Sequence, residues 1–345
     1  AVCLQDRGTQ TICKNVKMLS YQDTYYSNDP QGKGQYYFED SEIHGTIDYI
    51  CGGGDAYFNR VLLVNESRSA NSKSGEDVIA APNSKSDWGY IFKDCTIKAE
   101  KSGIDGNYTL GRPWGSGTPV ALFIDTKMEV IPTAAGWDEM SGGYPKRFAE
   151  YNSTTATGTA VDLSGRKQVY DAYDAKDGNN YTNRRNETAG NPVLTAEEAA
   201  FYTVETVMGG DDDWDPTAAT EQASAPTNVK IAGNNLTWDN SNYALLWAVC
   251  KDGKVVDFTV EPTYAVDDAS ATWSVRAANE MGGLGEATVA STSTGIENIA
   301  TSSDVLSTKI YSADGVQVSK LQRGINIVVK TMTDGSKKTS KVVLK

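Results

Sequence analysis

The stretch YIFKDCTI, residues 90–97, carries the pattern that decides the fold. Two apolar residues are followed by one spacer, Asp94, two variable residues and the apolar Ile97. The same frame occurs in five segments, with its Asn or Asp at Asn15, Asp40, Asn59, Asp94 and Asp125. Short apolar runs that recur every 19 to 35 residues or so are typical of a parallel β-helix with loops of variable length. We therefore predict an all-β chain built on a right-handed parallel β-helix.

Composition limits the partners and the chemistry. The net charge of −13 argues against binding nucleic acid, because phosphate binding needs a basic surface. No apolar run is long enough to span a membrane. A single histidine cannot build a Cys/His metal cluster, so we predict no metal and no cofactor. The five cysteines are an odd number, and we expect buried free thiols, with Cys13 at an apolar frame position and Cys95 facing either side.

Polar residues recur at the spacing of one coil. Asp23 in SYQDTYY and Asp48 in GTIDYICGG are 25 positions apart (48 − 23). If both point outward at the same angle, they lie on adjacent strands about 4.8 Å apart. Two carboxylates at that distance do not both ionise easily, so one of them is expected to hold a proton.

Further polar residues supply the groups needed to hydrolyse an ester without a serine, a metal or a histidine. Arg112 in LGRPWG would keep one carboxylate ionised as a nucleophile, and the other could then protonate a leaving alcohol. Gln22 would donate its amide to the oxyanion that forms on the ester carbonyl. Trp114 offers a flat face on which a sugar ring can stack.

At these residues the chain resembles the pectin methylesterases. YQDTYY is similar to the family's QDTLY segment, GTIDYICGG to GTVDFIFGN, and YTLGRPWG to YLGRPW. The segments GWDEM, RFAEYNST and LTAEEAAFYTVETVMGGDDDWDP follow in the family's order, so the resemblance covers about residues 1–216. It implies roles for eight residues: Asp48 as nucleophile, Asp23 as general acid and then base, Gln22 in the oxyanion hole, Arg112 orienting Asp48, and Tyr26, Trp114, Met140 and Cys51 along the galacturonate subsites.

Two features depart from the family pattern. Cys51 stands where the family usually has an aromatic residue, which makes one sugar contact smaller. The segment AVCLQDRGTQTICKNVKML resembles the family's QAVAL strand without its leading glutamine, which would be a second oxyanion donor. We therefore expect an N-terminally incomplete β-helix whose upstream coils and signal peptide lie outside this chain. A companion N-terminal segment could cover the exposed edge.

The C-terminal third has a different pattern. We predict the β-helix over residues 1–216, a linker at 217–227, a β-sandwich over 228–291, a second linker at 292–303, and a small β domain over 304–345. The sandwich, with Trp238 and Trp247 as core candidates, resembles a fibronectin type III module. The last segment resembles the sorting domain of proteins exported by Bacteroidetes, which implies a secreted or cell-surface bacterial protein.

Other polar residues have structural interpretations. His44 precedes Asp48 by four positions on a strand, too far for a hydrogen bond, and is expected to be structural. Asp55 in GGGDAYF is expected to be a turn residue. The acidic run at residues 211–213 lacks the spaced ligands of a calcium loop and is expected to be solvated.

Three classes of function remain open. The first is hydrolysis of methyl esters in homogalacturonan, with release of methanol. The second is a β-helix glycoside hydrolase or lyase acting on pectin. Glycosidases place their two carboxylates about 5 to 9.5 Å apart, and carboxylates on adjacent coils are closer together than most of that range. The third is a non-catalytic polysaccharide-binding surface protein. Methanol release from esterified pectin separates the first class from the other two.

Overall fold

A computed structural model describes residues 1–29, 32–66, 77–83, 87–115, 117–239, 244–292, 305–312, 317–318, 320, 322, 324–332 and 337–344. The chain divides into two compact units. The first comprises Ala1–Ala223 with Asn279–Gly283, and the second comprises Ser224–Ala278 and Leu284–Lys345. None of the helices in the described ranges is long and apolar enough to cross a membrane.

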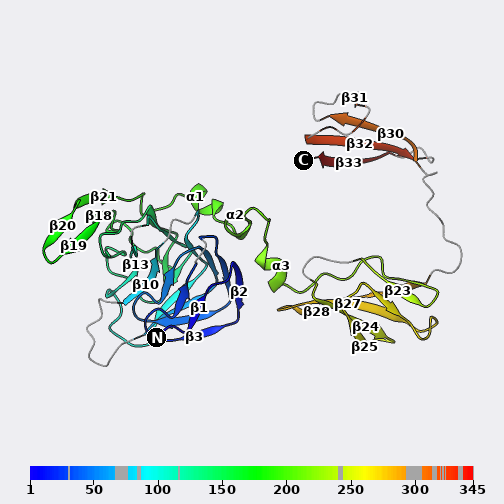
Figure 1. The fold of residues 1–345 in the computed structure, drawn as a ribbon, viewed down its shortest axis with the longest axis horizontal. Coiled ribbons are helices and arrows are strands. Elements are labelled where there is room, and N and C mark those ends of the chain that lie inside the picture. Colours follow the sequence, from blue (N-terminus) through cyan, green and yellow to red (C-terminus); the bar gives the residue numbers. More distant parts are fainter. Residues whose placement is uncertain are drawn as a thin grey trace. The chain divides into compact units, whose positions relative to one another are not determined.

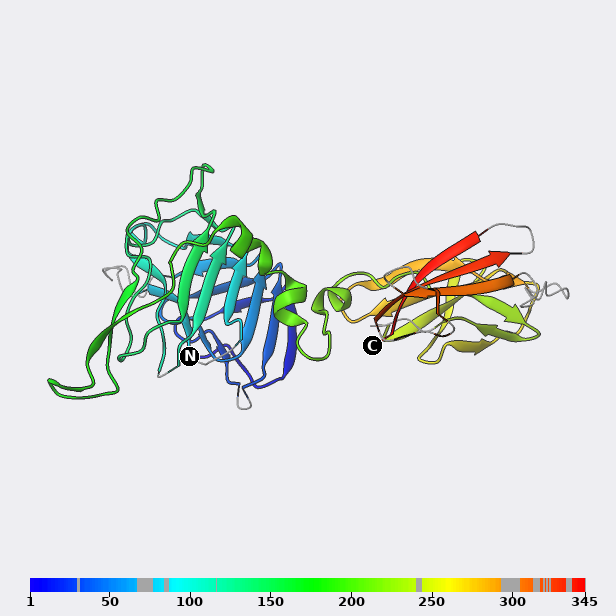
Figure 2. The ribbon, with the colours of Figure 1, turned by 90° about the horizontal axis from the view of Figure 1, so that it is seen from above.

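Three parallel sheets wind through the first unit (Figures 1 and 2). Sheet A contains β1 (Leu4–Asp6), β4 (Tyr25–Ser27), β7 (Ile50–Gly52), β10 (Asp77–Pro82) and β13 (Tyr108–Gly111). Sheet B contains β2 (Gln10–Lys14), β5 (Gln35–Glu39), β8 (Asp55–Asn59), β11 (Tyr90–Lys93), β14 (Val120–Ile124) and β16 (Arg147–Tyr151). Sheet C contains β3 (Lys17–Leu19), β6 (Glu42–Gly45), β9 (Leu62–Asn65), β12 (Thr96–Ala99), β15 (Lys127–Met128) and β17 (Thr154–Thr155). Parallel strands are joined by right-handed crossovers, and the predicted right-handed parallel β-helix is confirmed.

The turn from sheet B to sheet C explains the repeated Asn and Asp. Six residues there adopt left-handed backbone angles with φ between 48° and 55°: Asn15, Asp40, Arg60, Asp94, Asp125 and Asn152. Asn and Asp tolerate this conformation better than other side chains do. The repeat frame aligned Asn59 with Asp94, and this alignment was wrong by one residue, because Lys93 pairs with Asn59 in the sheet. Arg60 occupies the turn instead, and its guanidinium binds Asp40 of the preceding coil.

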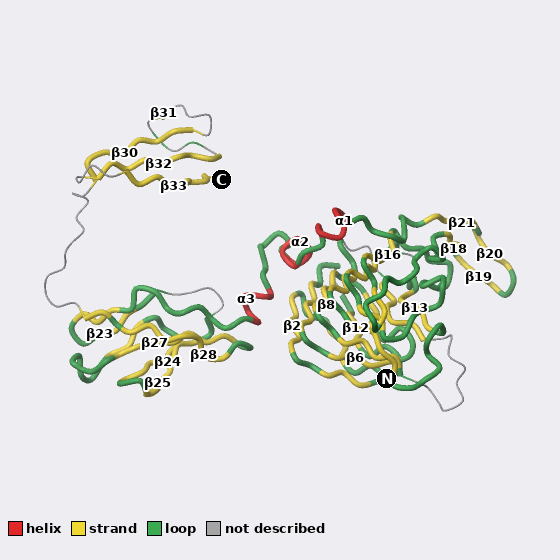
Figure 3. Tube along the Cα trace, turned by 180° about the vertical axis from the view of Figure 1, so that it is seen from behind, coloured by secondary structure: helices red, strands yellow, loops and turns green. Residues whose placement is uncertain are grey.

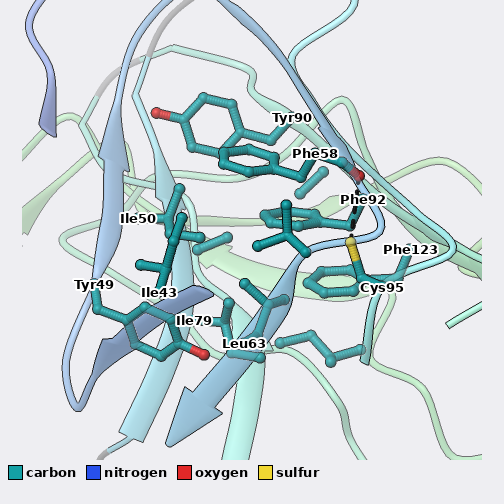
Figure 4. Close-up of a cluster of buried hydrophobic side chains, with 14 of the residues drawn as sticks. Ile43, Tyr49, Ile50, Phe58, Leu63, Ile79, Tyr90, Phe92, Cys95 and Phe123 are labelled. Atoms are coloured by element: carbon teal, nitrogen blue, oxygen red, sulfur yellow. Dashed lines mark hydrogen bonds between the residues drawn. The ribbon is translucent and has the colours of Figure 1, made fainter. Parts of the chain in front are cut away.

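The interior of the coil is a column of stacked rings. Phe38, Phe58, Phe92 and Phe123 lie on successive strands of sheet B, with ring centroids 4.8, 4.5 and 4.3 Å apart. Figure 4 shows three of these rings beside Cys95, whose thiol donates to the Phe58 carbonyl. All five cysteines are free; Cys3 is exposed and the other four are buried, so the thiols predicted to be buried and unpaired are confirmed.

At β16 the stacking position is taken by a charged residue. Phe123 pairs with Glu150, which is fully buried. The Arg166 guanidinium binds one Glu150 oxygen, and the Ser153 hydroxyl donates to the other over 2.7 Å. A buried ion pair therefore takes the ring position on β16, a feature that the apolar frame did not predict, while Trp137 contacts both Phe123 and Phe148 with centroids 6.0 and 4.9 Å away.

After β17 the chain leaves the coil. Two antiparallel pairs, β18 (Val169–Ala172) with β21 (Arg185–Thr188) and β19 (Ala175–Asp177) with β20 (Asn180–Thr182), form an extended arm that Figure 3 shows beside β16. Three short helices follow: α1 (Ala196–Phe201), α2 (Val204–Met208) and α3 (Pro216–Thr220). Helix α3 occupies the first part of the predicted linker at 217–227, because Asp215 caps its backbone amides and Pro216 suits its first position.

The described residues of the second unit form three four-stranded sheets. One sheet contains β22 (Lys230–Ala232), β23 (Asn235–Thr237), β26 (Thr263–Ala265) and β29 (Ser291–Thr292). Another contains β24 (Leu246–Lys251), β25 (Lys254–Thr259), β27 (Trp273–Asn279) and β28 (Gly283–Val289). Trp238 and Trp247 are buried with ring centroids 5.9 Å apart, which confirms them as core residues.

The last sheet is formed by β30 (Val305–Ser312), β31 (Gln317–Val318), β32 (Gly324–Met332) and β33 (Lys337–Leu344). These strands lie within the small β domain expected over residues 304–345. The predicted linker at 292–303 lies outside the described residues, apart from its first position.

Candidate active site

The two predicted catalytic aspartates are neighbours on adjacent coils. Each lies just before a strand of sheet A, Asp23 before β4 and Asp48 before β7. Gln22 forms an isolated bridge with Ile47, and Tyr25 pairs with Ile50, so the two aspartates occupy equivalent positions. Neighbouring strands lie about 4.8 Å apart. The adjacency predicted from the spacing of 25 residues is confirmed.

Local sequence explains how the turns present these carboxylates. Asp23 and Asp48 both have left-handed φ angles, 53° and 47°, which aspartate tolerates. Gly45 ends β6, and a Cβ there would lie 2.0 Å from the Tyr49 Cβ, so the turn that leads to Asp48 requires glycine. The sequence GTIDY is therefore constrained by backbone geometry as well as by its carboxylate.

Arg112 clamps Asp48. The guanidinium donates to both carboxylate oxygens, over 2.8 Å to Oδ1 and 2.7 Å to Oδ2. Arg112 follows β13, and its amide donates to the Ala80 carbonyl of β10, so its side chain reaches back across β10 to β7. Burial lowers the pKa of Arg112, but the hydrogen bond and charge of Asp48 outweigh it and raise the pKa overall. The predicted contact between Arg112 and Asp48 is confirmed.

Asp23 has a different environment. Burial and the charge of Asp48 raise the pKa of its carboxyl, although a hydrogen bond from Cys51 and the charge of Arg112 act in the opposite direction. Asp48 is paired with a cation, whereas Asp23 has no ion pair among the described residues. The two neighbouring carboxyls are thus unequal, and Asp23 holds a proton more readily than an ordinary aspartate.

Gln22 is exposed beside this pair. Its backbone is fixed by the bridge to Ile47 of the next coil. Among the described residues its side-chain amide makes no hydrogen bond, so its two N–H groups are available to a ligand. This position fits the predicted role of an oxyanion donor, which stays a prediction.

Two aromatic rings meet over sheet A. The centroids of Tyr26 and Trp114 are 6.0 Å apart, with an angle of 54° between the ring planes. Tyr26 lies on β4 and Trp114 follows β13, and β7 and β10 separate these strands in the sheet. The rings therefore lean toward each other above the two middle strands. Both are half-buried, so parts of their faces remain available to a ligand.

Met140 lies in a loop that packs against the Trp114 segment. The Asp138 amide donates to the Gly111 carbonyl over 2.9 Å, and Gly143 approaches the Gly115 carbonyl so closely that a Cβ would lie 2.6 Å away. Asp138 also contributes to the raised pKa of Arg112 through its charge. Sequence reasoning did not single out Asp138, although it lies inside the quoted motif GWDEM.

Cys51 differs most from its predicted role as a sugar contact. It pairs with Tyr26 in sheet A and is only 2% exposed. Its thiol donates to Asp23 Oδ1 over 3.7 Å. The side chain therefore contacts the aspartate and offers little surface to a substrate.

The remaining candidates have structural contacts. The two ring nitrogens of His44 lie 2.6 Å from Glu66 and 2.5 Å from Glu42, so His44 does not pair with Asp48. Asp55 was expected in a turn, but it is the first residue of β8, and its carboxylate accepts from the backbone amides of Trp88 and Gly89. The acidic residues at 211–213 are exposed, as predicted.

The candidate site lies at sheet A and is separate from a groove elsewhere in the first unit. One groove of about 570 Å³ is lined by residues such as Gln35, Trp88 and Gly210, and contains neither aspartate. Within the described residues, no three His, Cys, Asp or Glu side chains are grouped so that they could hold a metal ion.

Comparison with known proteins identifies the family of this chain. The Pectinesterase family model matches residues 1–186. The chain belongs to the pectinesterase family. All eight predicted site residues lie within the part of the chain that matches the pectinesterase model.

Individual pectinesterases match the same part of the chain. The probable pectinesterase A of Aspergillus flavus is 32% identical over 171 residues, covering 49% of this chain and 48% of that protein. Pectinesterase A of Emericella nidulans is 30% identical over 168 residues, covering 48% and 47%. The solved pectin methylesterase PemA from Erwinia chrysanthemi has 27% identity and a TM-score of 0.44, covering 60% of this chain and 58% of that chain. The chain spans about half the length of the curated relatives it matches.

Proposed function

We propose that this chain hydrolyses the methyl esters of galacturonate residues in homogalacturonan and releases methanol. The observation that carries the proposal is the unequal pair of neighbouring carboxyls. Asp48 is clamped by Arg112, and the pKa of Asp23 is raised. Membership of the pectinesterase family supports the same conclusion.

In the first half-reaction the Asp48 carboxylate attacks the ester carbonyl carbon. Arg112 holds the attacking group in one orientation, which removes much of the entropic cost of reaching the reactive geometry. The Gln22 amide donates to the negative oxygen of the tetrahedral intermediate. Asp23 gives its proton to the methoxy oxygen, methanol leaves, and an acyl–Asp48 anhydride remains.

In the second half-reaction Asp23, now ionised, removes a proton from water. The resulting hydroxide adds to the galacturonate acyl carbon, and the bond to Asp48 breaks. The products are a galacturonate carboxyl group, the free Asp48 carboxylate and a protonated Asp23. Asp23 therefore acts as acid and then as base, which requires a carboxyl that changes protonation state easily near the working pH.

The aromatic rings of Tyr26 and Trp114 supply a surface for sugar rings. Galacturonate rings have apolar C–H faces that stack on aromatic side chains. The two rings meet above the middle strands of sheet A, on the side where the carboxyls lie. We assign Met140 to the edge of the same surface, because its loop packs on the Trp114 segment.

Glycoside hydrolysis or lysis on the same scaffold is the alternative. A glycosidase would use its two carboxyls on opposite sides of a glycosidic bond, about 5 to 9.5 Å apart. Here the Arg112 guanidinium reaches across β10 to clamp the Asp48 carboxylate, which suits acyl transfer.

The experiment is to incubate the purified chain with highly esterified pectin and measure methanol, reducing ends and unsaturated uronate together. The proposal expects methanol and new carboxyl groups without shorter chains. New reducing ends or unsaturated products without methanol would contradict it and favour the glycosidase or lyase. Binding to pectin without any product would favour a non-catalytic binding protein.

We also propose the domain order expected from the sequence, with a sandwich over 228–291 similar to a fibronectin type III module and a C-terminal sorting-type domain over 304–345. Two four-stranded sheets with a Trp238–Trp247 core support the first assignment. The sheet of β30 to β33 supports the second. Expression in a Bacteroidetes host, with and without residues 304–345, tests whether this segment directs secretion.

A further inference from the structure

A buried thiol lies against the proposed general acid. Cys51 follows Asp48 by three positions on β7, and its neighbour across sheet A is Tyr26 on β4, three positions after Asp23. This register brings the Cys51 sulfur to 3.7 Å from Asp23 Oδ1, within the range of a hydrogen bond that involves sulfur. Among the described residues, it is the hydrogen-bonding side chain that contacts the Asp23 carboxyl.

The thiol is the donor in this contact. Cys51 is 2% exposed, and burial together with the charges of Asp23 and Asp48 raises the pKa of the thiol. Cys51 therefore keeps its proton, and a neutral S–H group beside a carboxylate can only donate. Its burial also argues against a direct contact with a sugar ring.

We propose that Cys51 is a positioning residue that fixes the Asp23 carboxyl in the candidate site by donating a hydrogen bond to Oδ1. The inference rests on the proposed function, in which Asp23 acts as acid and then as base. Asp48 is held by two hydrogen bonds from Arg112. Asp23 sits at a left-handed turn with φ 53°, and the thiol is what orients its side chain.

The contact also influences the protonation of Asp23. Three side chains on neighbouring elements face this carboxyl: Asp48, the Cys51 thiol and Arg112. Burial and Asp48 raise the pKa of Asp23, whereas the Cys51 thiol and Arg112 lower it. The thiol thus offsets part of the effect of burial and helps Asp23 to ionise, which the second half-reaction needs.

The test compares Cys51→Ala with Cys51→Ser in the full chain. Alanine removes the donor, and serine replaces it with a hydroxyl. The Asp23 carboxyl is titrated by NMR, and the pH profile of kcat/KM is measured for methanol release. We expect alanine to move the Asp23 titration and the alkaline limb of the profile upward by roughly half a pH unit. Serine should return both to the wild-type position or below it.

The kinetic constants separate positioning from substrate contact. Loss of a positioning residue should lower kcat at neutral pH by about threefold and leave KM nearly unchanged. Loss of a sugar contact would raise KM and leave the Asp23 titration in place, which would overturn the proposal. An unchanged titration in Cys51→Ala would overturn it as well.

Cys95→Ala is the matched control. Cys95 is also a buried thiol, 1% exposed, but it donates to the Phe58 carbonyl in the core (Figure 4). It should lose stability without moving the Asp23 titration. If Cys51→Ala does not fold, a raised Asp23 titration in Cys51→Ser contradicts the proposal. Absence of methanol from the wild-type chain would instead contradict the proposed function, and the NMR titration would still test the contact.

Discussion

The Arg112 guanidinium and the Asp48 carboxylate meet fork to fork, with two hydrogen bonds of 2.8 and 2.7 Å. A planar guanidinium fixes the direction of a carboxylate as well as its charge. We expect Arg112→Ala to lower kcat by about two orders of magnitude and to move the acid limb of the pH–rate profile to higher pH. Arg112→Lys should recover only part of the rate, because lysine keeps the charge and loses the fork.

Arg147 provides the control for this experiment. It forms an equivalent two-bond pair with Glu198, and its side chain is 22% exposed, as is that of Arg112. Arg147→Ala should leave the pH–rate profile unchanged. If Arg112→Ala also left the profile unchanged, Arg112 would have no role in orienting the proposed nucleophile.

Asp23 should destabilise the fold when it is ionised. Its folded pKa is raised above the ordinary value of 3.8, so folding is disfavoured once the pH exceeds the folded pKa, and the penalty disappears below 3.8. We expect Asp23→Asn to raise the Tm at pH 7 to 8 and to leave it unchanged at pH 3. The same variant should lose methanol release by at least about a hundredfold.

Asp125→Asn should have the opposite effect on the Tm at neutral pH. Asp125 has a similar left-handed φ of 54°, but hydrogen bonds from Lys93 and Asn152 outweigh burial and lower its pKa. Its contribution to stability is present above pH 3.8 and is lost as the pH falls through the lower folded value. Asp125→Asn should therefore lower the Tm at neutral pH. A lower Tm for Asp23→Asn at neutral pH would contradict our assignment of its environment.

Several parts of this site follow from sequence alone. Asp23 and Asp48 are separated by one coil, and a coil of fixed length places equivalent positions side by side. The contact between Cys51 and Asp23 could not be read in the same way, because the exposure of Cys51 depends on side chains from other strands. Asn59 was aligned with Asp94 because residues 56–58 fit the apolar frame equally well one position early. The left-handed turn at Arg60 could not be predicted from residue type, because the contact that stabilises it comes from Asp40 of another coil.

The elements that end the coil were harder to predict. Glu150 occupies a core position of β16, where the repeat frame expects an apolar residue. Its charge is compensated by Arg166, which lies in a later loop, so the sequence pattern alone could not show that the position is buried. The short helix α1 has no long apolar period, but its capping box of Thr195 and Glu198 is visible in LTAEE. Local capping signals were therefore available where periodicity was not.

The buried pair of Arg166 and Glu150 should be important for stability. Both side chains are almost fully buried, at 1% and 0% exposure. Arg166→Ala leaves an uncompensated carboxylate in the core, and we expect it to lower the free energy of unfolding by about 3 to 5 kcal/mol. The free energy of unfolding of Arg185→Ala, which breaks an exposed pair with Glu187, should change far less, because solvent screens that pair. Equal losses in the two variants would contradict this assignment.

Trp114 should contribute to binding more than to chemistry. Trp114→Ala removes the ring that meets Tyr26, and we expect KM for pectin to rise about tenfold with kcat within about threefold of wild type. Trp88→Ala, a half-buried tryptophan in a different groove, should leave KM unchanged. A fall in kcat at constant KM would place Trp114 in the catalytic step instead.

The most direct measurement is methanol release by Asp48→Asn on highly esterified pectin. Asparagine keeps the shape of the side chain and can still contact Arg112, so the fold and pectin binding should remain nearly intact, as checked by Tm and a pectin-binding assay. The account predicts that methanol release is abolished, because the attacking oxygen is gone. Turnover above about a tenth of wild type in the folded variant would show that Asp48 is not the nucleophile.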